Sequence, residues 1–211
     1  MVEETDRECS KHLVITFDGA IYTTNLNLPN RAFSAEVTFY LQHHQLLKLE
    51  AQKPPLHFHP YQEEYIEVTQ GRLAVEVDGK ERILSLKDGV LAVKPWSRHR
   101  LYPPPNHGSQ VTKFILSGAM TEEQYRLDKL FFSNWYAYQD RIFIHGAKIS
   151  LIQVMSMFDA AGSYLSLPQW ILWGYTLSHV LGILTARWVG GLLGYQPYYR
   201  DWSSDWNLVC S

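Results

Sequence analysis

Short stretches in which hydrophobic and polar residues alternate make up the first half of the chain. Gly, Pro and Asp-Gly pairs separate these stretches, which is typical of antiparallel strands joined by tight turns. Asp18-Gly19 and Asp78-Gly79 each predict a hairpin, because these residues tolerate the positive φ angles of two-residue turns. The pattern predicts a mainly β barrel or sandwich over residues 12–118. Its expected strands are 13–17, 20–24, 34–40, 46–50, 64–68, 73–77, 82–86, 90–93 and 111–116.

The spacing of apolar residues becomes helical after residue 119. Thr121-Glu-Glu-Gln124 has the form of a capping box and predicts a helix that starts at Thr121 and continues to Tyr138. A second amphipathic helix is expected over residues 149–160, and Gly162 would end it. We therefore expect a helical extension over residues 119–211 that packs on the outside or the mouth of the β domain.

A third segment of the extension, about residues 168–194, is strongly apolar. Ser166-Leu-Pro168-Gln169 predicts its start as a helix, and Arg187 is its charged residue. Small residues recur at every fourth position, and Trp and Tyr gather near the two ends. Two interpretations stay open: membrane association through residues 168–194, or a helix that packs tightly on the β domain or across a dimer.

Composition narrows the classes of partner and compartment. The chain has 211 residues and a net charge of −2 without a basic patch, which argues against nucleic acid as a partner. Cys9 and Cys210 are the two cysteines, so a reducing compartment is the default, although their pairing stays open. Residues 1–11 are charged and polar, which predicts a flexible N-terminus without a targeting signal. We expect a cytoplasmic protein, with membrane association as the alternative.

Candidate chemistry lies between Pro54 and Pro104. His57 and His59 are two residues apart, so on a strand both imidazoles point to the same face. Glu64 follows a short turn, and His99 comes 35 residues later on another expected strand. Three imidazoles and one carboxylate are donors that suit one divalent transition metal, such as Fe, Mn, Ni, Cu or Zn. The sequence therefore predicts a metal site with the ligands His57, His59, Glu64 and His99.

These residues also resemble the motifs of the cupin superfamily. His57-x-His59-x4-Glu64-x6-Gly71 is similar to the first cupin motif, with every fixed position filled. Gly89 and the segment 94–99 are similar to the second motif, although Lys94 and Trp96 stand where Pro and Gly are usual. The resemblance covers roughly residues 34–117 and implies a single cupin β-barrel, or jelly roll, with the metal inside. A degenerate, metal-free cupin is the alternative.

The apolar helical tail after a single barrel resembles uncharacterised fungal cupins, some of which belong to natural-product pathways. This implies a metal-dependent enzyme that isomerises or cyclises, decarboxylates or oxidises a small aromatic or polyketide-like molecule. The alternative is a non-catalytic module that binds a small molecule, with the tail as a membrane or partner anchor. Small cupins often pair through barrel strands, so a homodimer is expected.

Residues beside the expected ligands could supply acid–base or orienting groups. The candidates are Tyr61, Gln62, Glu63 and Lys94, and Glu63 is also a rival of Glu64 for the carboxylate ligand. Alternation places Arg98 and Arg100 on the face opposite His99, where we expect surface charges. The sequence contains no Gly-x-Ser-x-Gly, Walker loop or dinucleotide fingerprint, so it offers no support for those chemistries.

Overall fold

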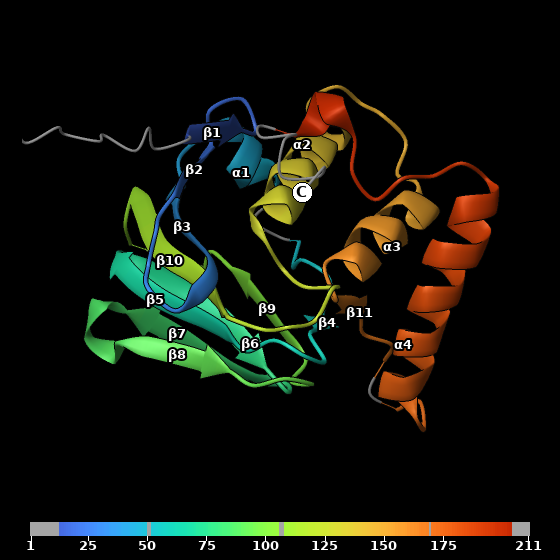
Figure 1. Ribbon diagram of the computed structural model, residues 1–211. Coiled ribbons are helices and arrows are strands. Elements are labelled where there is room, and N and C mark those ends of the chain that lie inside the picture. The colour runs from blue at the N-terminus through green and yellow to red at the C-terminus, as the bar shows by residue number, and fades with distance from the viewer. Residues whose placement is uncertain (1–12, 50–51, 106–107, 169, 204–211) are drawn as a thin grey trace, which may run out of the picture.

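Two antiparallel sheets pack around one apolar core in the computed structural model, which describes residues 13–49, 52–105, 108–168 and 170–203 (Figure 1). The first sheet has the order β1 (Leu13–Thr16), β2 (Ile21–Asn25), β3 (Arg31–Tyr40), β10 (Val111–Ala119), β5 (Glu64–Gln70) and β8 (Val90–Val93). The second sheet has the order β11 (Tyr164–Leu165), β4 (His57–Phe58), β9 (His99–Tyr102), β6 (Arg72–Val77) and β7 (Lys80–Ser85).

The prediction of a mainly β domain is confirmed, and side chains from both sheets fill its core. Phe33, Ile66, Leu73 and Phe114 lie on four different strands and are almost completely buried. Burial of each such side chain stabilises the fold by roughly 1.5–3 kcal/mol. The structure shows two sheets, and closure into a barrel stays a prediction.

The predicted Asp78-Gly79 hairpin is confirmed and joins β6 to β7. Both residues have positive φ angles, 48° and 78°, and Val77 pairs with Lys80 across the two-residue turn. This geometry matches the right-handed twist of the two strands. A short 3-10 turn, Leu86–Asp88, then leads into β8.

The predicted strand 46–50 is wrong as far as it lies within the described residues, since this segment forms the helix α1 (His44–Leu49). The carbonyl of His43 accepts the N–H groups of Leu46 and Leu47, which closes the first helical turn. Leu46 and Leu49 are three residues apart and both pack against the core. Apolar spacing in so short a segment fits one helical turn as well as a strand.

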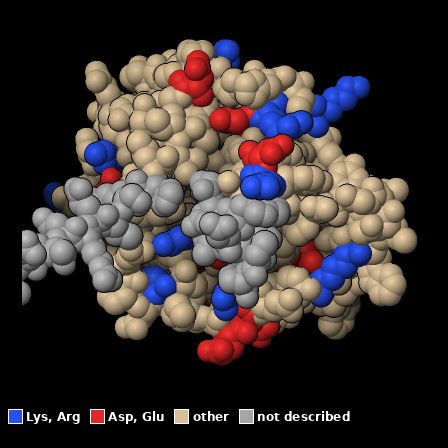
Figure 2. Space-filling view, turned by 45° about the horizontal axis from the view of Figure 1, so that its top comes forward, with Lys and Arg blue, Asp and Glu red and all other residues tan. Residues whose placement is uncertain are grey.

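Three helices follow the strands and form layers that extend away from the sheets. Figure 1 shows α2 and α3 nearer the sheets and α4 on the outer side of α3. Lys, Arg, Asp and Glu are interspersed over the face shown in Figure 2. The elements of the extension are α2 (Lys129–Phe143), α3 (Leu151–Ala160), α4 (Gly174–Ile183), a π-helix that continues α4 (Leu184–Gly190) and a 3-10 turn (Arg200–Trp202).

The predicted start of the first of these helices is wrong, and the second prediction is confirmed. Helix α2 starts at Lys129 and not at Thr121, because Asp128 is its N-cap and accepts the N–H of Phe131 at 2.7 Å. Helix α3 starts after the N-cap Ser150 and lies within the predicted range 149–160. Gly162 follows α3 with a φ of 57°, as expected of a helix stop.

The predicted helix 168–194 is wrong in its first part. Ser166 is not a cap, because the chain there leaves strand β11 and the N–H of Ser166 bonds to the carbonyl of Leu56. The helix starts at Gly174, after Trp173 with a left-handed φ of 62°. Within the described residues, no helix has both the length and the apolar character that a membrane span requires.

The extension is attached to the sheets at the strand that carries His57. Strand β11 pairs with β4, with Leu165 opposite His57. Asp159 on α3 accepts two hydrogen bonds from Arg187 on the π-helix, at 2.8 and 3.0 Å, and one from the Tyr164 hydroxyl at 3.0 Å. These contacts connect the outer helix to the edge of the second sheet.

Candidate metal centre

Three histidines that are distant in the sequence converge between the sheets and the helices. The register of β4 and β9 places His57 directly opposite His99, with ring centroids 4.4 Å apart. The ring of His59 lies 5.0 Å from His99 and 5.2 Å from His57. One ligand atom from each residue can be chosen so that the three lie within 4.8 Å of one another. The structure thus brings together three of the four predicted ligands.

Glu64, the fourth predicted ligand, joins this group from the other sheet. It is the first residue of β5, and its Oε2 lies 2.9 Å from Nε2 of His99. Both side chains are almost fully buried. A buried carboxylate needs a partner that compensates for its lost hydration, and His99 supplies one here.

Backbone carbonyls orient two of the imidazoles. Nδ1 of His99 lies 2.9 Å from the carbonyl of Ser97, and Nδ1 of His57 lies 3.3 Å from the carbonyl of Pro55. A carbonyl oxygen only accepts hydrogen bonds, so each Nδ1 carries the proton when the ring is neutral. Nε2 of His57 is then left with a free electron pair, as a metal ligand requires, whereas Nε2 of His99 has such a pair once it loses the proton that it donates to Glu64.

The buried imidazole of His59 is the strongest indication that this site binds a metal ion. The residue is 3% exposed, and although the Gly162 backbone approaches its ring, neither ring nitrogen has a hydrogen bond of normal geometry among the described residues. Buried polar atoms are nearly always satisfied by protein, water or a metal. The free nitrogen, two oriented imidazoles and a carboxylate therefore fit a divalent transition metal.

Burial keeps two of the histidines uncharged. Loss of hydration, together with the nearby charge of His99, lowers the pKa of His57 to about 3 and the pKa of His59 well below its usual value. Burial also opposes charge on His99, but the hydrogen bond and charge of Glu64 outweigh it and raise the pKa of His99. At neutral pH His57 and His59 are thus ready to donate electron pairs, whereas a proton on His99 competes with a metal as the pH falls.

A cavity of about 360 Å³ adjoins the histidines and is bounded on the far side by α2. His57, His59 and Glu64 lie in its wall, and most of the other lining side chains are apolar. This volume is in the range of small-molecule sites. The aromatic residues that line it include Phe39, Phe131, Phe132, Trp135, Phe143 and Phe158.

Two polar residues on α2 also line the cavity, and the sequence analysis missed both. Tyr136 bonds to Thr23, and burial raises the pKa of Tyr136 to about 12, with a contribution from the charge of Glu64. Gln139 lies three residues further, on the same helix face, and its amide forms no hydrogen bond within the described residues. The sequence carries no motif for either residue, because both fall on a face with ordinary amphipathic spacing.

Gln62, Glu63, Tyr61 and Lys94 do not line the described part of the cavity. The Gln62 amide donates to the carbonyl of Ala119 at 2.9 Å and accepts the N–H of Leu127 at 2.8 Å, so it holds the segment before α2. The Glu63 carboxylate accepts the Tyr65 hydroxyl at 2.7 Å. Tyr61 and Lys94 are exposed. A catalytic role for these four residues stays a prediction.

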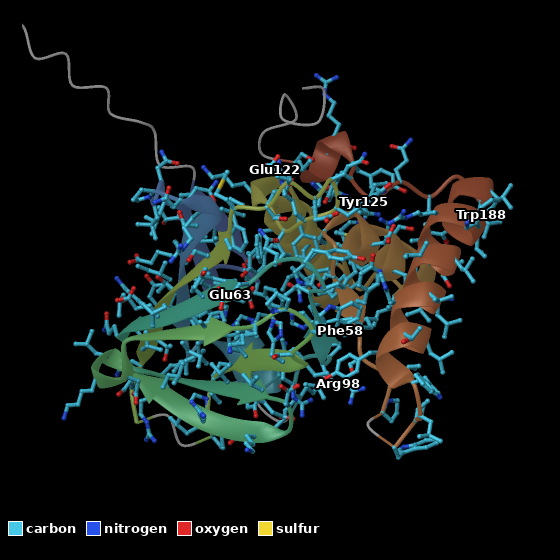
Figure 3. The ribbon with its side chains drawn as sticks, turned by 60° about the horizontal axis from the view of Figure 1, so that its bottom comes forward. Phe58, Glu63, Arg98, Glu122, Tyr125 and Trp188 are labelled. Carbon is cyan, nitrogen blue, oxygen red and sulfur yellow. The ribbon has the colours of Figure 1, made fainter. Side chains whose placement is uncertain are left out.

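The expected surface position of Arg98 is wrong. Arg98 is 8% exposed, its guanidinium carbon lies 3.9 Å from the centre of the Tyr175 ring, and its Nε has no partner among the described residues. Figure 3 shows Arg98 on the side of the sheets that carries α4. Alternation does place Arg98 opposite His99, but the start of α4 covers that face. Arg100 is half-buried and pairs with Glu76 at 2.7 Å.

Comparison with known proteins finds several relatives. The chain is 38% identical over 200 residues to oxidoreductase AOL_s00215g277 of Arthrobotrys oligospora, which covers 93% of this chain and 79% of that protein. It is 40% identical over 198 residues to probable oxidoreductase yanE of Aspergillus niger, which covers 92% of this chain and 77% of that protein.

No protein-family model matches the chain. Among solved structures, an RmlC-like cupin from Shewanella frigidimarina matches with 16% identity and a TM-score of 0.37, over 58% of this chain and 95% of that chain.

Proposed function

The chain belongs to the family of oxidoreductases that includes yanE and AOL_s00215g277, and we propose that it is itself a metal-dependent oxidoreductase that acts on a small, largely apolar molecule. One observation carries this proposal. Three imidazoles and a carboxylate form one cluster, and His57, His59 and Glu64 of this cluster line a cavity whose remaining walls are mostly apolar.

His57, His59, Glu64 and His99 would hold the metal. A divalent ion bound there would supply Lewis-acid chemistry and a change of oxidation state. Zinc does not change its oxidation state, so an oxidoreductase favours Fe, Mn, Ni or Cu from the predicted set. The carbonyls of Pro55 and Ser97 keep two of the imidazoles in the orientation that ligation needs.

The wall formed by α2 would select and orient the substrate. Its aromatic side chains exclude water and favour an aromatic or otherwise flat apolar molecule. The phenol of Tyr136 is protonated at neutral pH, as any phenol is, and burial raises its pKa further, so it can donate a hydrogen bond to a substrate oxygen. The amide of Gln139, which forms no hydrogen bond with the described residues, offers a donor and an acceptor on the same face. A substrate with a hydroxyl or carbonyl group on an apolar skeleton would satisfy both residues.

The proposal is tested by metal analysis combined with turnover of a panel of aromatic and polyketide-like compounds. We expect bound Fe, Mn, Ni or Cu in the wild type, and oxidised products that mass spectrometry detects. His57→Ala and His99→Ala should lose both the metal and the products. His179→Ala is the matched control, because His179 packs against Tyr164 outside the cavity lining.

Two results would count against the proposal. Equal metal content in the wild type and both cavity variants would remove the metal centre. Metal that depends on His57 and His99, together with tight binding of panel compounds without turnover, would instead identify a non-catalytic binding module.

A further inference from the structure

A second cluster of metal-ligating side chains lies outside the group of His57, His59 and His99. Asp18 belongs to the turn between β1 and β2, whereas His43 and His44 lie at the start of α1. Each of the three offers one ligand atom, and these atoms lie within 4.8 Å of one another. We infer that Asp18, His43 and His44 bind a second divalent first-row metal ion, such as Zn²⁺.

The backbone holds the three residues in place. Phe17 and Asp18 both have left-handed φ angles, 54° and 56°, which residues other than Gly rarely adopt. Such conformations persist where the surrounding structure fixes them, and they are frequent at functional sites. His43 is fixed as well, because its N–H bonds to the carbonyl of Tyr40 at 2.9 Å. The backbone positions are thus fixed, and an ion bound at about 2.0–2.2 Å from each donor, as zinc ligands need, would be reached by rotation of the exposed Asp18 and His44 and the partly buried His43 side chains.

The donor set and its surroundings favour a cation. Two imidazoles and one carboxylate are ligands that Zn²⁺ shares with its first-row neighbours. Asp18 and His44 are exposed, so water can fill the remaining coordination positions. A second carboxylate lies behind the turn, because Asp140 accepts the N–H of Phe17 at 2.6 Å. Its negative charge adds to that of Asp18 and attracts a metal ion.

Metal binding would break few of the hydrogen bonds that the three side chains form. Among the described residues, the one hydrogen bond to these three side chains is long, at 3.3 Å, and runs from the N–H of Gln45 to Nδ1 of His43. An ion bound at that nitrogen would replace this bond, and the other ring nitrogen would carry the proton. The ring of His44 contacts that of His43 at a centroid distance of 4.5 Å, so the two imidazoles can turn together.

The ion would connect two parts of the cavity rim. Phe17, next to Asp18, lines the cavity, and so do Leu46 and Leu47 in α1. A metal shared by Asp18 and the two histidines would therefore join the β1–β2 turn to α1 and stiffen this rim. The site needs none of the residues of the proposed oxidoreductase centre, so either site can exist without the other.

Zn²⁺ titration of the metal-free, full-length protein tests this inference. We expect the wild type to bind two equivalents of Zn²⁺. Asp18→Asn should bind one equivalent with unchanged affinity and the other at least about tenfold more weakly. Asn tolerates a left-handed φ, so this variant removes the negative charge without disturbing the turn. His43→Gln should have the same effect. The double variant His57→Gln/His99→Gln should keep the equivalent that Asp18→Asn loses, and Zn²⁺ should raise its Tm.

His145→Gln is the matched control, because His145 is exposed and does not belong to the cluster. Three results would overturn the inference: one equivalent in the wild type that His57→Gln/His99→Gln removes, a second equivalent that survives both Asp18→Asn and His43→Gln, or a second equivalent that His145→Gln weakens equally.

Discussion

The strand wall and the helix wall of the cavity carry different chemistry. On the strand wall lie His57 and Glu64, and His99 behind them contacts both; the two imidazoles also bond to backbone carbonyls. On the helix wall, α2 presents aromatic side chains and two polar groups, Tyr136 and Gln139, of which Gln139 has no hydrogen bond within the described chain. The strand wall thus gathers the predicted metal ligands in fixed positions, whereas the helix wall leaves hydrogen-bonding capacity for a ligand.

The largest effect should come from the strand wall, where Glu64 and Glu63 form a matched pair. The two are adjacent on the chain, but only Glu64 contacts His99 and lines the cavity. Glu64→Gln removes a negative charge from the metal centre, so metal affinity should fall by about 100-fold or more. The affinity of the purified variants for Co²⁺ or Fe²⁺, measured by competition with a chelator, checks this.

Glu63→Gln is the control and should bind metal as the wild type does, because Glu63 bonds to Tyr65 instead. If Glu63→Gln lost the metal and Glu64→Gln kept it, the rival carboxylate would be the ligand. The assignment of Glu64 to the strand wall would then be wrong.

Tyr136 and Tyr138 test the helix wall in the same way. Both lie on α2, but only Tyr136 lines the cavity. Tyr136→Phe should lower kcat by about 100-fold with the metal still bound, since loss of one oriented donor has an effect of that size. The Tyr138 hydroxyl accepts the N–H of Ser150 at 2.9 Å and bonds to its carbonyl at 3.2 Å. Tyr138→Phe should lower the free energy of unfolding by about 1–3 kcal/mol and leave kcat unchanged.

Turnover and chemical denaturation of both variants separate the two roles. Equal losses of kcat in Tyr136→Phe and Tyr138→Phe would mean that the helix wall acts only through stability. The proposed difference between the strand wall, which would bind the metal, and the helix wall, which would bind the substrate, would then be wrong.

The strand wall could largely be predicted from the sequence, because the spacing of residues along each strand determines which side chains share a face. Alternation along a strand has a period of two, so the spacing of His57 and His59 already places both imidazoles on one face. The register of β4 against β9 then adds His99, and the short turn before β5 adds Glu64. The ligand set therefore follows from periodicity and the motif spacing.

The helix wall could not be predicted in the same way, because tertiary contacts decide it. The Thr121 hydroxyl accepts the N–H of Glu123 at 3.2 Å but starts no helix there, since the Gln62 side chain holds the carbonyl of Ala119 and the N–H of Leu127. The burial of Arg98, on the other face of β9, also depends on tertiary contacts that the local sequence does not predict. Its direction was predicted correctly, but the cover that Gly174 and Tyr175 provide depends on where α4 starts.

The smallest effect should come from the outer helix, which supports the strand wall from behind. A Cβ added at Gly182 would lie 2.6 Å from the buried ring of Tyr164, whose β11 strand pairs with the β4 strand of His57. The Tyr164 hydroxyl is held by Asp159, so the ring cannot move freely. Gly182→Ala should therefore lower the free energy of unfolding by about 1–3 kcal/mol.

Gly191→Ala is the matched control, because Gly191 has a helical φ of −59° and nothing lies within 4 Å of an added Cβ. It should instead stabilise the protein by about 0.5–1 kcal/mol through helix propensity. Thermal and urea unfolding of the two variants measure whether each substitution raises or lowers the free energy of unfolding. If Gly182→Ala also weakens metal binding, the outer helix influences the position of β4. Displacement of Tyr164 would move β11, which pairs with β4 at His57. A stabilising effect of both substitutions would show that the helix packs too loosely on β11 to support the strand wall.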